Sequence, residues 1–173
     1  MARRGCDAPD SWTTNCWRRV ECVTVTDPLA LDRQVCFALA VTNRAVLGVY
    51  RPILEPLGLT HPQYLVMLAL WERTPQSAGD IARTLCLDPA SATPLLKRLE
   101  VRGLLTRRRS EDDERRLVVD LTAAGHDLRA EAEKVPARVV EALGVDTADL
   151  ERLHAALSVV NHHANFVAER IEQ

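Results

Sequence analysis

Cationic side chains are concentrated in one segment of the sequence, LKRLEVRGLLTRRRSEDDERRL, which runs from Leu96 to Leu117. The eight cations of this segment are Lys97, Arg98, Arg102, Arg107, Arg108, Arg109, Arg115 and Arg116. Its five carboxylates, Glu100, Glu111, Asp112, Asp113 and Glu114, lie mostly in one charged turn. Because guanidinium and ammonium groups neutralise phosphates, this clustering predicts a surface suited to the backbone of a nucleic acid.

The spacing of apolar residues predicts how this segment folds. It begins with the three-and-four spacing of an amphipathic helix, breaks at Gly103, and continues as two short apolar runs around the charged turn, which is typical of a helix followed by a β-hairpin. Upstream, Ser77 is a predicted N-cap for a short helix ending near Leu87, and Asp88 for the next helix, with Pro89 at its first position. Two helices around a tight turn and then a hairpin make a winged helix-turn-helix.

A run of charges is more often only the solvated face of a domain. Here the run coincides with a predicted helix-turn-helix and wing, which favours contact with DNA. The helix starting after Asp88 offers backbone N–H groups and a partial positive charge to phosphate, and the hairpin tip suits a minor groove, with Arg115 held in shape by Asp113. The predicted DNA-binding residues are Ser91, Thr93, Lys97, Arg98, Arg107, Arg109, Asp113 and Arg115.

Long helices are predicted on both sides of this region. Before it, apolar residues step by three and four from Leu31 until Pro52, Pro56 and Gly58, and a further helix follows Thr60 and ends before Thr74. After it, we expect a helix over residues 126–143, bent at Pro136 and ended by Gly144, and then a last helix capped by Asp146 or Thr147.

The last helix carries a regular apolar stripe: Leu150, Leu153, Leu157, Val160, Ala164, Val167 and Ile171. Such alternation of three- and four-residue steps is typical of helices that pack in a coiled-coil manner. The stripe could cover the chain's own core. We favour packing against a second subunit, together with the first helix.

Composition limits the class of protein. The chain has 173 residues, 47% of them hydrophobic, which fits one domain with a core, and its net charge of −2 does not by itself indicate nucleic acid. The longest apolar run is too short to cross a bilayer, and the N-terminus lacks an apolar secretion segment, so a cytoplasmic protein is expected. Five cysteines without a CxxC pair predict neither a disulfide framework nor a metal site, and no cofactor is expected.

The predicted fold class is therefore mainly α with a small β-hairpin. Residues 1–27 show no apolar periodicity and are expected to be a disordered tail. Residues 28–58 and 122–173 are the predicted dimerisation helices, and residues 59–121 form the predicted winged helix-turn-helix.

Two segments, LTHPQYLVMLALWE and LDPASATPLLKRLEVRGLLTRRRSEDDERRLVVDLTAAG, resemble the MarR family of dimeric winged-helix repressors. Within the family, VCFAL, YRPILEPLGLT and TPLLKRLE are similar to the branch that senses organic hydroperoxides, known as OhrR. The likeness spans roughly residues 32–165. It implies a homodimer, not an enzyme, that binds an inverted-repeat operator in double-stranded DNA and represses transcription.

The resemblance also implies a thiol sensor. Cys36 stands at the position of the sensing cysteine, Tyr50 matches one tyrosine that activates it, and His61 and Ala40 replace two others. The implied reaction is attack of sulfur on a peroxide O–O bond, which gives a sulfenic acid and an alcohol. Because no cysteine follows Cys86, capping by a small cellular thiol is expected rather than a protein disulfide.

Spacing adds a geometric expectation about Tyr50. Fourteen residues of straight helix rise about 21 Å, so Tyr50 should meet the Cys36 of the other subunit. His61 could act near the thiolate as a partial cation or as a hydrogen-bond donor.

Two alternatives remain open. A small aromatic or lipophilic ligand could release the repressor from DNA, with Cys36 only lining the cleft. A thiol peroxidase is the other, but the sequence supplies neither a resolving cysteine nor a nucleotide-binding loop.

Overall fold

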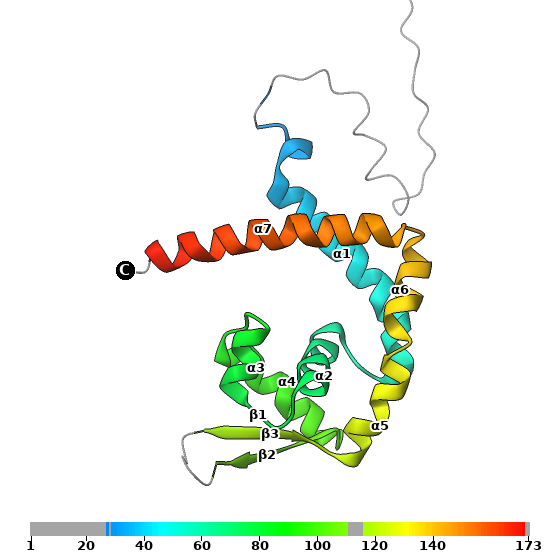
Figure 1. Ribbon diagram of the computed structural model, residues 1–173, viewed down its shortest axis with the longest axis vertical. Helices are drawn as coiled ribbons and strands as arrows, with labels where there is room; N and C mark the ends of the chain where they lie inside the picture. The colour runs from blue at the N-terminus through cyan, green and yellow to red at the C-terminus, as the bar shows by residue number, and fades with distance from the viewer. Residues whose placement is uncertain (1–26, 28, 111–115, 172–173) are drawn as a thin grey trace, which may run out of the picture. The chain divides into compact units, whose positions relative to one another are not determined.

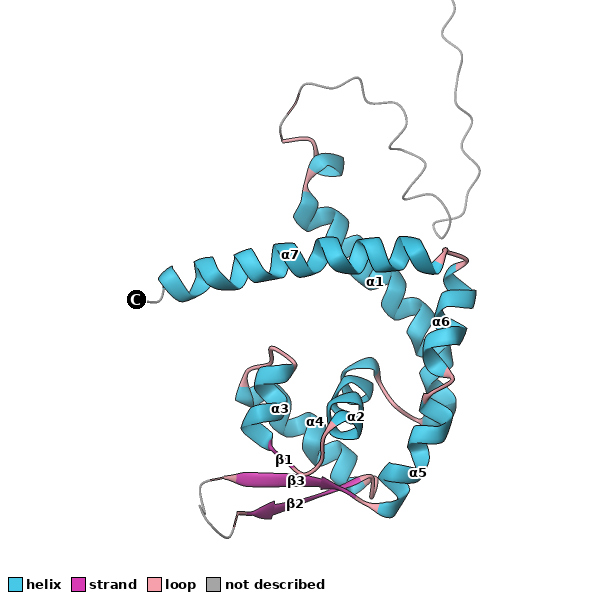
Figure 2. Cartoon of the chain, in the orientation of Figure 1, coloured by secondary structure: helices cyan, strands magenta, loops and turns pink. Residues whose placement is uncertain are grey.

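The computed structural model describes residues 27, 29–110 and 116–171, which form helices and one small sheet (Figures 1 and 2). The α-helices are α1 Val35–Leu54, α2 His61–Glu72, α3 Ala78–Thr84, α4 Pro89–Val101, α5 Ala123–Ala132, α6 Val135–Leu143 and α7 Thr147–Ile171. Two short 3-10 helices, η2 Leu31–Arg33 and η3 Glu55–Leu57, flank α1, and the strands are β1 Gln76–Ser77, β2 Leu105–Arg109 and β3 Leu117–Leu121. The predicted mainly α class with a β-hairpin is confirmed.

The chain divides after Arg44, inside α1, into two units. In the described part of the first unit, η2 buries no residue, and the large apolar side chains of Leu31, Val35 and Leu39 are exposed. The first long helix starts later than the apolar spacing suggests, because the chain forms η2 before α1 begins at Val35.

The second unit, residues 45–173, contains the hydrophobic core. Helices α2, α3 and α4 contact one another, and α3 and α4 also contact the sheet. The largest fully buried side chains are Leu54, Met67, Leu70, Ile81, Leu96, Leu99, Leu105, Val66, Val119 and Val135. Each large aliphatic side chain contributes about 1.5–3 kcal/mol on burial, so this cluster fixes the placement of the two helices and the hairpin of the predicted DNA-binding region.

The predicted caps of the helix-turn-helix are confirmed. The Ser77 hydroxyl accepts the Asp80 backbone N–H at 3.0 Å, and the Asp88 carboxylate accepts that of Ser91 at 2.8 Å. Helix α3 ends at Thr84, three residues before the predicted end at Leu87. It stops there because the chain turns through Cys86, whose φ of 51° is left-handed and cannot continue a right-handed helix.

The sheet has three strands rather than the two predicted, in the order β1-β3-β2 (Figure 1). Strands β2 and β3 form the predicted hairpin, with Leu105 opposite Leu121 and Arg109 opposite Leu117. The additional strand β1 pairs with β3 through only two residues. A strand of two residues shows no alternation of polar and apolar side chains, so the sequence carried no signal for it.

The predicted bent helix over residues 126–143 is in fact two helices, and this expectation is corrected. Helix α5 ends at Ala132 and α6 begins at Val135. Pro136 therefore occupies the first turn of α6, where a proline without an N–H removes no intrahelical hydrogen bond. Gly144 ends α6 as predicted, with φ of 61°.

Helix α7 begins at Thr147, and the Asp146 carboxylate accepts the Ala148 N–H at 3.1 Å, so Asp146 caps it. None of the described helices has a stretch long and apolar enough to cross a membrane.

Candidate DNA-binding surface and thiol site

Helix α4 divides its residues between the core and solvent. It buries Ala92, Leu96 and Leu99. On the other side it exposes four of the residues predicted to contact DNA: Ser91, Thr93, Lys97 and Arg98. The second helix of the helix-turn-helix therefore presents hydroxyl groups in its first turns and cations one turn later.

The hydroxyl groups at the start of α4 are already engaged within the helix. Ser91 donates its hydroxyl proton to the Asp88 carboxylate at 2.7 Å, and Thr93 donates to the Pro89 carbonyl at 2.8 Å. The hydrogen bonds from the Ser91 side chain and backbone hold the pKa of Asp88 below its usual value. The helix N-terminus thus already faces one carboxylate, and both hydroxyl oxygens keep free lone pairs to accept a hydrogen bond.

Arg107 lies on the wing but binds a carboxylate of α4. Its Nε and Nη2 donate to Glu100 Oε2 at 2.9 and 2.5 Å, and its backbone N–H donates to Glu100 Oε1 at 3.2 Å. These hydrogen bonds hold the pKa of Glu100 below its usual value. Only 19% of the Arg107 side chain is exposed, whereas its neighbours Arg108 and Arg109 are exposed.

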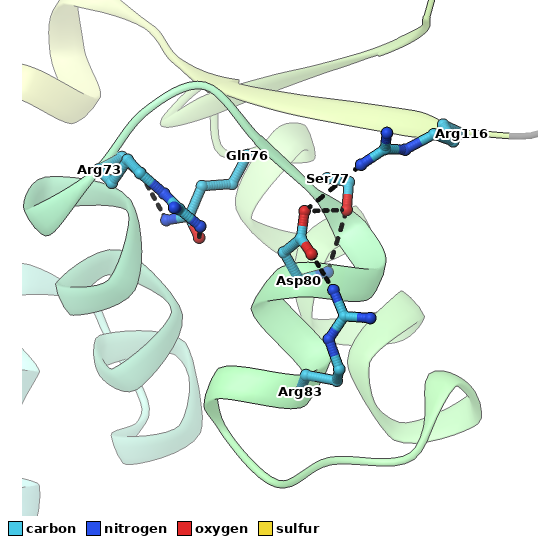
Figure 3. Close-up of polar contacts among 6 residues, drawn as sticks. All are labelled: Arg73, Gln76, Ser77, Asp80, Arg83 and Arg116. Atoms are coloured by element: carbon cyan, nitrogen blue, oxygen red, sulfur yellow. Dashed lines mark hydrogen bonds and ion pairs between the residues drawn. The ribbon is translucent and has the colours of Figure 1, made fainter. Parts of the chain in front are cut away.

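Arg116 binds a carboxylate of α3. Its Nη2 lies 3.7 Å from Asp80 Oδ2, and Figure 3 shows the Arg116 side chain, from the residue before β3, and the Asp80 side chain of α3 reaching toward each other. Asp80 also accepts the Ser77 hydroxyl at 2.6 Å and pairs with Arg83. The Ser77 hydrogen bond, together with these two arginines, keeps the pKa of Asp80 below its usual value.

A third arginine of the cationic segment also forms hydrogen bonds within the chain. Arg102, at the end of α4, donates to the backbone carbonyls of Leu57 at 3.1 Å and of Gly58. Arg102, Arg107 and Arg116 therefore have partners within the chain. Arg98 and Arg108 are exposed and have no carboxylate partner among the described residues. Two predicted DNA-binding residues, Asp113 and Arg115, lie outside the described residues.

Sequence reasoning missed Asp80 and Glu100 as the carboxylates that hold these arginines. Glu100 precedes Arg107 by seven residues across the Gly103 break, a separation that becomes a contact only when the hairpin folds back on α4. Asp80 had one signal, its place three residues after the Ser77 cap, but that spacing points to helix capping and not to the wing.

Cys36 is the second residue of α1, and its side chain is exposed. The first turn of a helix carries a partial positive charge that favours a negative group such as a thiolate. The first unit thus offers an accessible sulfur at a helix N-terminus.

In the second unit, Tyr50 and His61 are in contact. Their ring centroids are 4.9 Å apart with the rings edge to face, and Tyr64 continues the aromatic row 6.2 Å from Tyr50. Burial lowers the pKa of His61, so the imidazole is neutral at neutral pH. Of the two roles considered for His61, this favours the hydrogen-bond donor over the cation.

The described residues contain no group of three or more histidine, cysteine, aspartate or glutamate side chains that could hold a metal ion.

Comparison with known proteins identifies the family of this chain. Residues 59–117 match the model of the MarR family. The chain is 38% identical over 131 residues to the organic hydroperoxide resistance transcriptional regulator of Bacillus subtilis, a match that covers 76% of this chain and 89% of the relative. The chain belongs to the MarR family. As a MarR protein it is a DNA-binding transcriptional regulator, and the family is not one of enzymes.

Solved structures of other MarR-type regulators share the fold. Reduced AbfR bound to DNA, a protein of Staphylococcus epidermidis, matches with a TM-score of 0.64 and 32% identity, over 78% of this chain and 94% of AbfR. The repressor CouR bound to a 23-mer DNA duplex matches with a TM-score of 0.68 and 27% identity, over 82% of this chain and 99% of CouR. CouR from Rhodococcus jostii has also been solved with p-coumaroyl-CoA, at a TM-score of 0.64, 27% identity, and coverage of 76% and 94%.

Proposed function

We propose that this MarR protein is a homodimeric repressor that binds an inverted-repeat operator and releases it when an organic hydroperoxide oxidises Cys36. The observation that carries the proposal is an exposed cysteine in the first turn of α1, in a chain 38% identical to a regulator named for organic hydroperoxide resistance.

The chemistry needs only the thiol, the peroxide and a second thiol. The Cys36 thiolate attacks one peroxide oxygen, the O–O bond breaks, and the departing alkoxide takes a proton to become an alcohol, which leaves a sulfenic acid on Cys36. A small cellular thiol then condenses with the sulfenic acid and releases water, leaving a mixed disulfide. The added group enlarges a side chain on α1, the helix that we assign to the dimer interface.

In this proposal, Tyr50 and His61 of one subunit contact the Cys36 sulfur of the other subunit. Fourteen residues of a straight α-helix rise about 21 Å, which is more than a side-chain contact spans. A Tyr50 that meets Cys36 therefore belongs to the other copy. The neutral His61 beside it supplies an N–H donor in place of a phenol.

Dimerisation through α1 and α7 is supported by the apolar side chains that α7 leaves exposed. Leu153, Val159 and Val160 are 47%, 59% and 49% exposed, and two of them belong to the predicted stripe. Apolar residues repeated along one helix face are buried by pairing with a partner helix. The two winged helices of a dimer then bind half-sites about 34 Å apart, one turn of DNA.

Cys36→Ser tests the proposal. The probe is the duplex that the reduced wild-type protein selects most strongly from a randomised library, and release is followed by fluorescence anisotropy after adding cumene hydroperoxide. We expect wild type and the control variant Cys86→Ser to release the duplex and Cys36→Ser to stay bound. Intact-mass analysis with a small thiol should show one adduct per chain, on Cys36. If Cys36→Ser released the duplex after addition of cumene hydroperoxide, thiol sensing by Cys36 would be overturned.

A second candidate is release by a small aromatic or lipophilic ligand, favoured by the likeness to CouR bound to p-coumaroyl-CoA. It predicts that Cys36→Ser retains full regulation. Titrating the variant with p-coumaroyl-CoA and with simple phenols separates the two, because a ligand-released repressor responds without any change in protein mass.

A further inference from the structure

Two arginine–carboxylate pairs connect the wing to the helix-turn-helix, one from strand β2 and one from the residue just before β3. Arg107 of β2 pairs with Glu100 of α4, and Arg116, the residue before β3, pairs with Asp80 of α3. The two pairs thus join the hairpin to α4 and to α3, the two helices that together with the wing form what we call the reading head.

The two pairs differ in position along the hairpin. Arg107 lies in the middle of β2, opposite Val119. Arg116 lies at the outer end, where its carbonyl accepts the Ser110 backbone N–H at 2.8 Å, and in sequence it follows directly on the hairpin tip. One pair therefore lies at the middle of β2 and the other at the outer end of the hairpin.

Asp80 has further partners, whereas the partners shown for Glu100 are the side chain and the backbone of Arg107. Ser77, the cap of α3, donates its hydroxyl proton to Asp80, and Arg83 pairs with the same carboxylate (Figure 3). Glu100 accepts both the side chain and the backbone N–H of Arg107. A side chain whose rotamer is locked by such hydrogen bonds can position its partner precisely.

We propose that Asp80 and Glu100 are positioning residues for DNA binding, and that Arg107 and Arg116 orient the wing instead of neutralising phosphates. The proposal rests on DNA binding through α4 and the wing and does not depend on oxidation of Cys36. It removes Arg107 from the residues predicted to touch DNA and gives it a role in specificity.

Positioning by the carboxylates and simple electrostatics predict opposite changes in affinity for the selected duplex. Asp80→Asn and Glu100→Gln each remove a negative charge from the reading head, so electrostatics alone gives tighter binding to any duplex. If the carboxylates position the wing, both variants bind the selected duplex more weakly, and binding to a mixed-sequence duplex of equal length is unchanged or tighter. The ratio of the two affinities then falls.

Salt dependence separates a positioning arginine from one that contacts phosphate. Replacing a phosphate-contacting arginine reduces the slope of log K against log salt by about 1. We expect this loss for Arg108→Ala, the matched control on the same strand, and an unchanged slope for Arg107→Ala and Arg116→Ala. Since Arg116 is exposed, its variant keeps the test available if a carboxylate variant fails to fold.

The experiment measures Kd for both duplexes with the full-length reduced protein and completes the double-mutant cycle Asp80→Asn with Arg116→Ala. We expect the Kd for the selected duplex to rise at least about threefold in each single variant, with a coupling of similar size in the cycle. Equal or tighter specific binding by Asp80→Asn and Glu100→Gln, or loss of slope in Arg107→Ala, would overturn the proposal. Failure of the wild type to bind any duplex would instead overturn DNA binding.

Discussion

The imidazole ring of His61 lies edge-on against the phenol ring of Tyr50, with 4.9 Å between the ring centroids. Two of the three residues assigned to thiol sensing from the sequence are therefore neighbours across the junction of α1 and α2, although eleven positions separate them in the chain. The burial that accompanies this contact makes the charged form of His61 unfavourable.

This burial predicts a pH dependence of stability. Because the pKa of His61 is lowered in the folded state, the unfolded state binds its proton more readily, and the free energy of unfolding falls as the pH drops below about 6.5. Denaturant unfolding at about pH 7.5 and about pH 5.5 measures the loss. His61→Gln should lose less over this range, and an equal loss in the variant would show that His61 does not contribute.

Gly125 is predicted to be intolerant of any side chain. A Cβ at this position would lie 2.0 Å from the Leu104 carbonyl oxygen, a backbone atom that cannot rotate away. Gly125→Ala should lower the free energy of unfolding by about 1–3 kcal/mol or more. Gly48→Ala is the matched control, since a Cβ there meets nothing within 4 Å and alanine favours the helix. Thermal unfolding of the two variants should therefore shift in opposite directions.

The apolar stripe of α7 predicts a variant that is folded but monomeric. Val160→Glu places a charge in the stripe, which costs little in the monomer because Val160 is 49% exposed there, but disrupts an apolar interface. Light scattering coupled to size exclusion should give the dimer mass for wild type and the monomer mass for Val160→Glu. Ala155→Glu, on the opposite side of the helix, should remain dimeric, and a dimeric Val160→Glu would exclude this face as the interface.

Arg98 is predicted to contact phosphate. It is exposed on α4 and has no carboxylate partner among the described residues. Arg98→Ala should weaken binding about equally for the selected and the mixed-sequence duplex and reduce the salt slope by about 1. The control variant is Arg138→Ala, because Arg138 is equally an exposed arginine but lies on α6, outside the helix-turn-helix and wing. If Arg98→Ala changed the preference between the two duplexes, the side chain would be reading bases.

Local signals in the sequence predicted most of the helix-turn-helix and wing. Ser77 and Asp88 are caps because their side chains accept N–H groups three residues later, an interaction that needs only the adjacent turn. The hairpin followed from two short apolar runs around a charged turn. Helix ends set by backbone conformation, such as the turn at Cys86, carried no such signal, since a non-glycine residue with positive φ is uncommon.

The roles of the arginines could not be predicted from the sequence. A guanidinium beside a phosphate and one beside a carboxylate of the same fold look alike in a charge count, and the difference depends on which carboxylate the folded chain brings within reach. Arg107 and Arg108 are adjacent in sequence, yet the first is held by Glu100 and the second is exposed, because successive side chains of a strand point to opposite faces.

The hydrogen bonds from Arg102 to the carbonyls of Leu57 and Gly58 connect helix α4 to the segment between α1 and α2. The C-terminal end of α4 is thereby anchored to the same short stretch of chain that leads from Tyr50 to His61. A movement of that stretch would therefore shift α4 as a rigid helix.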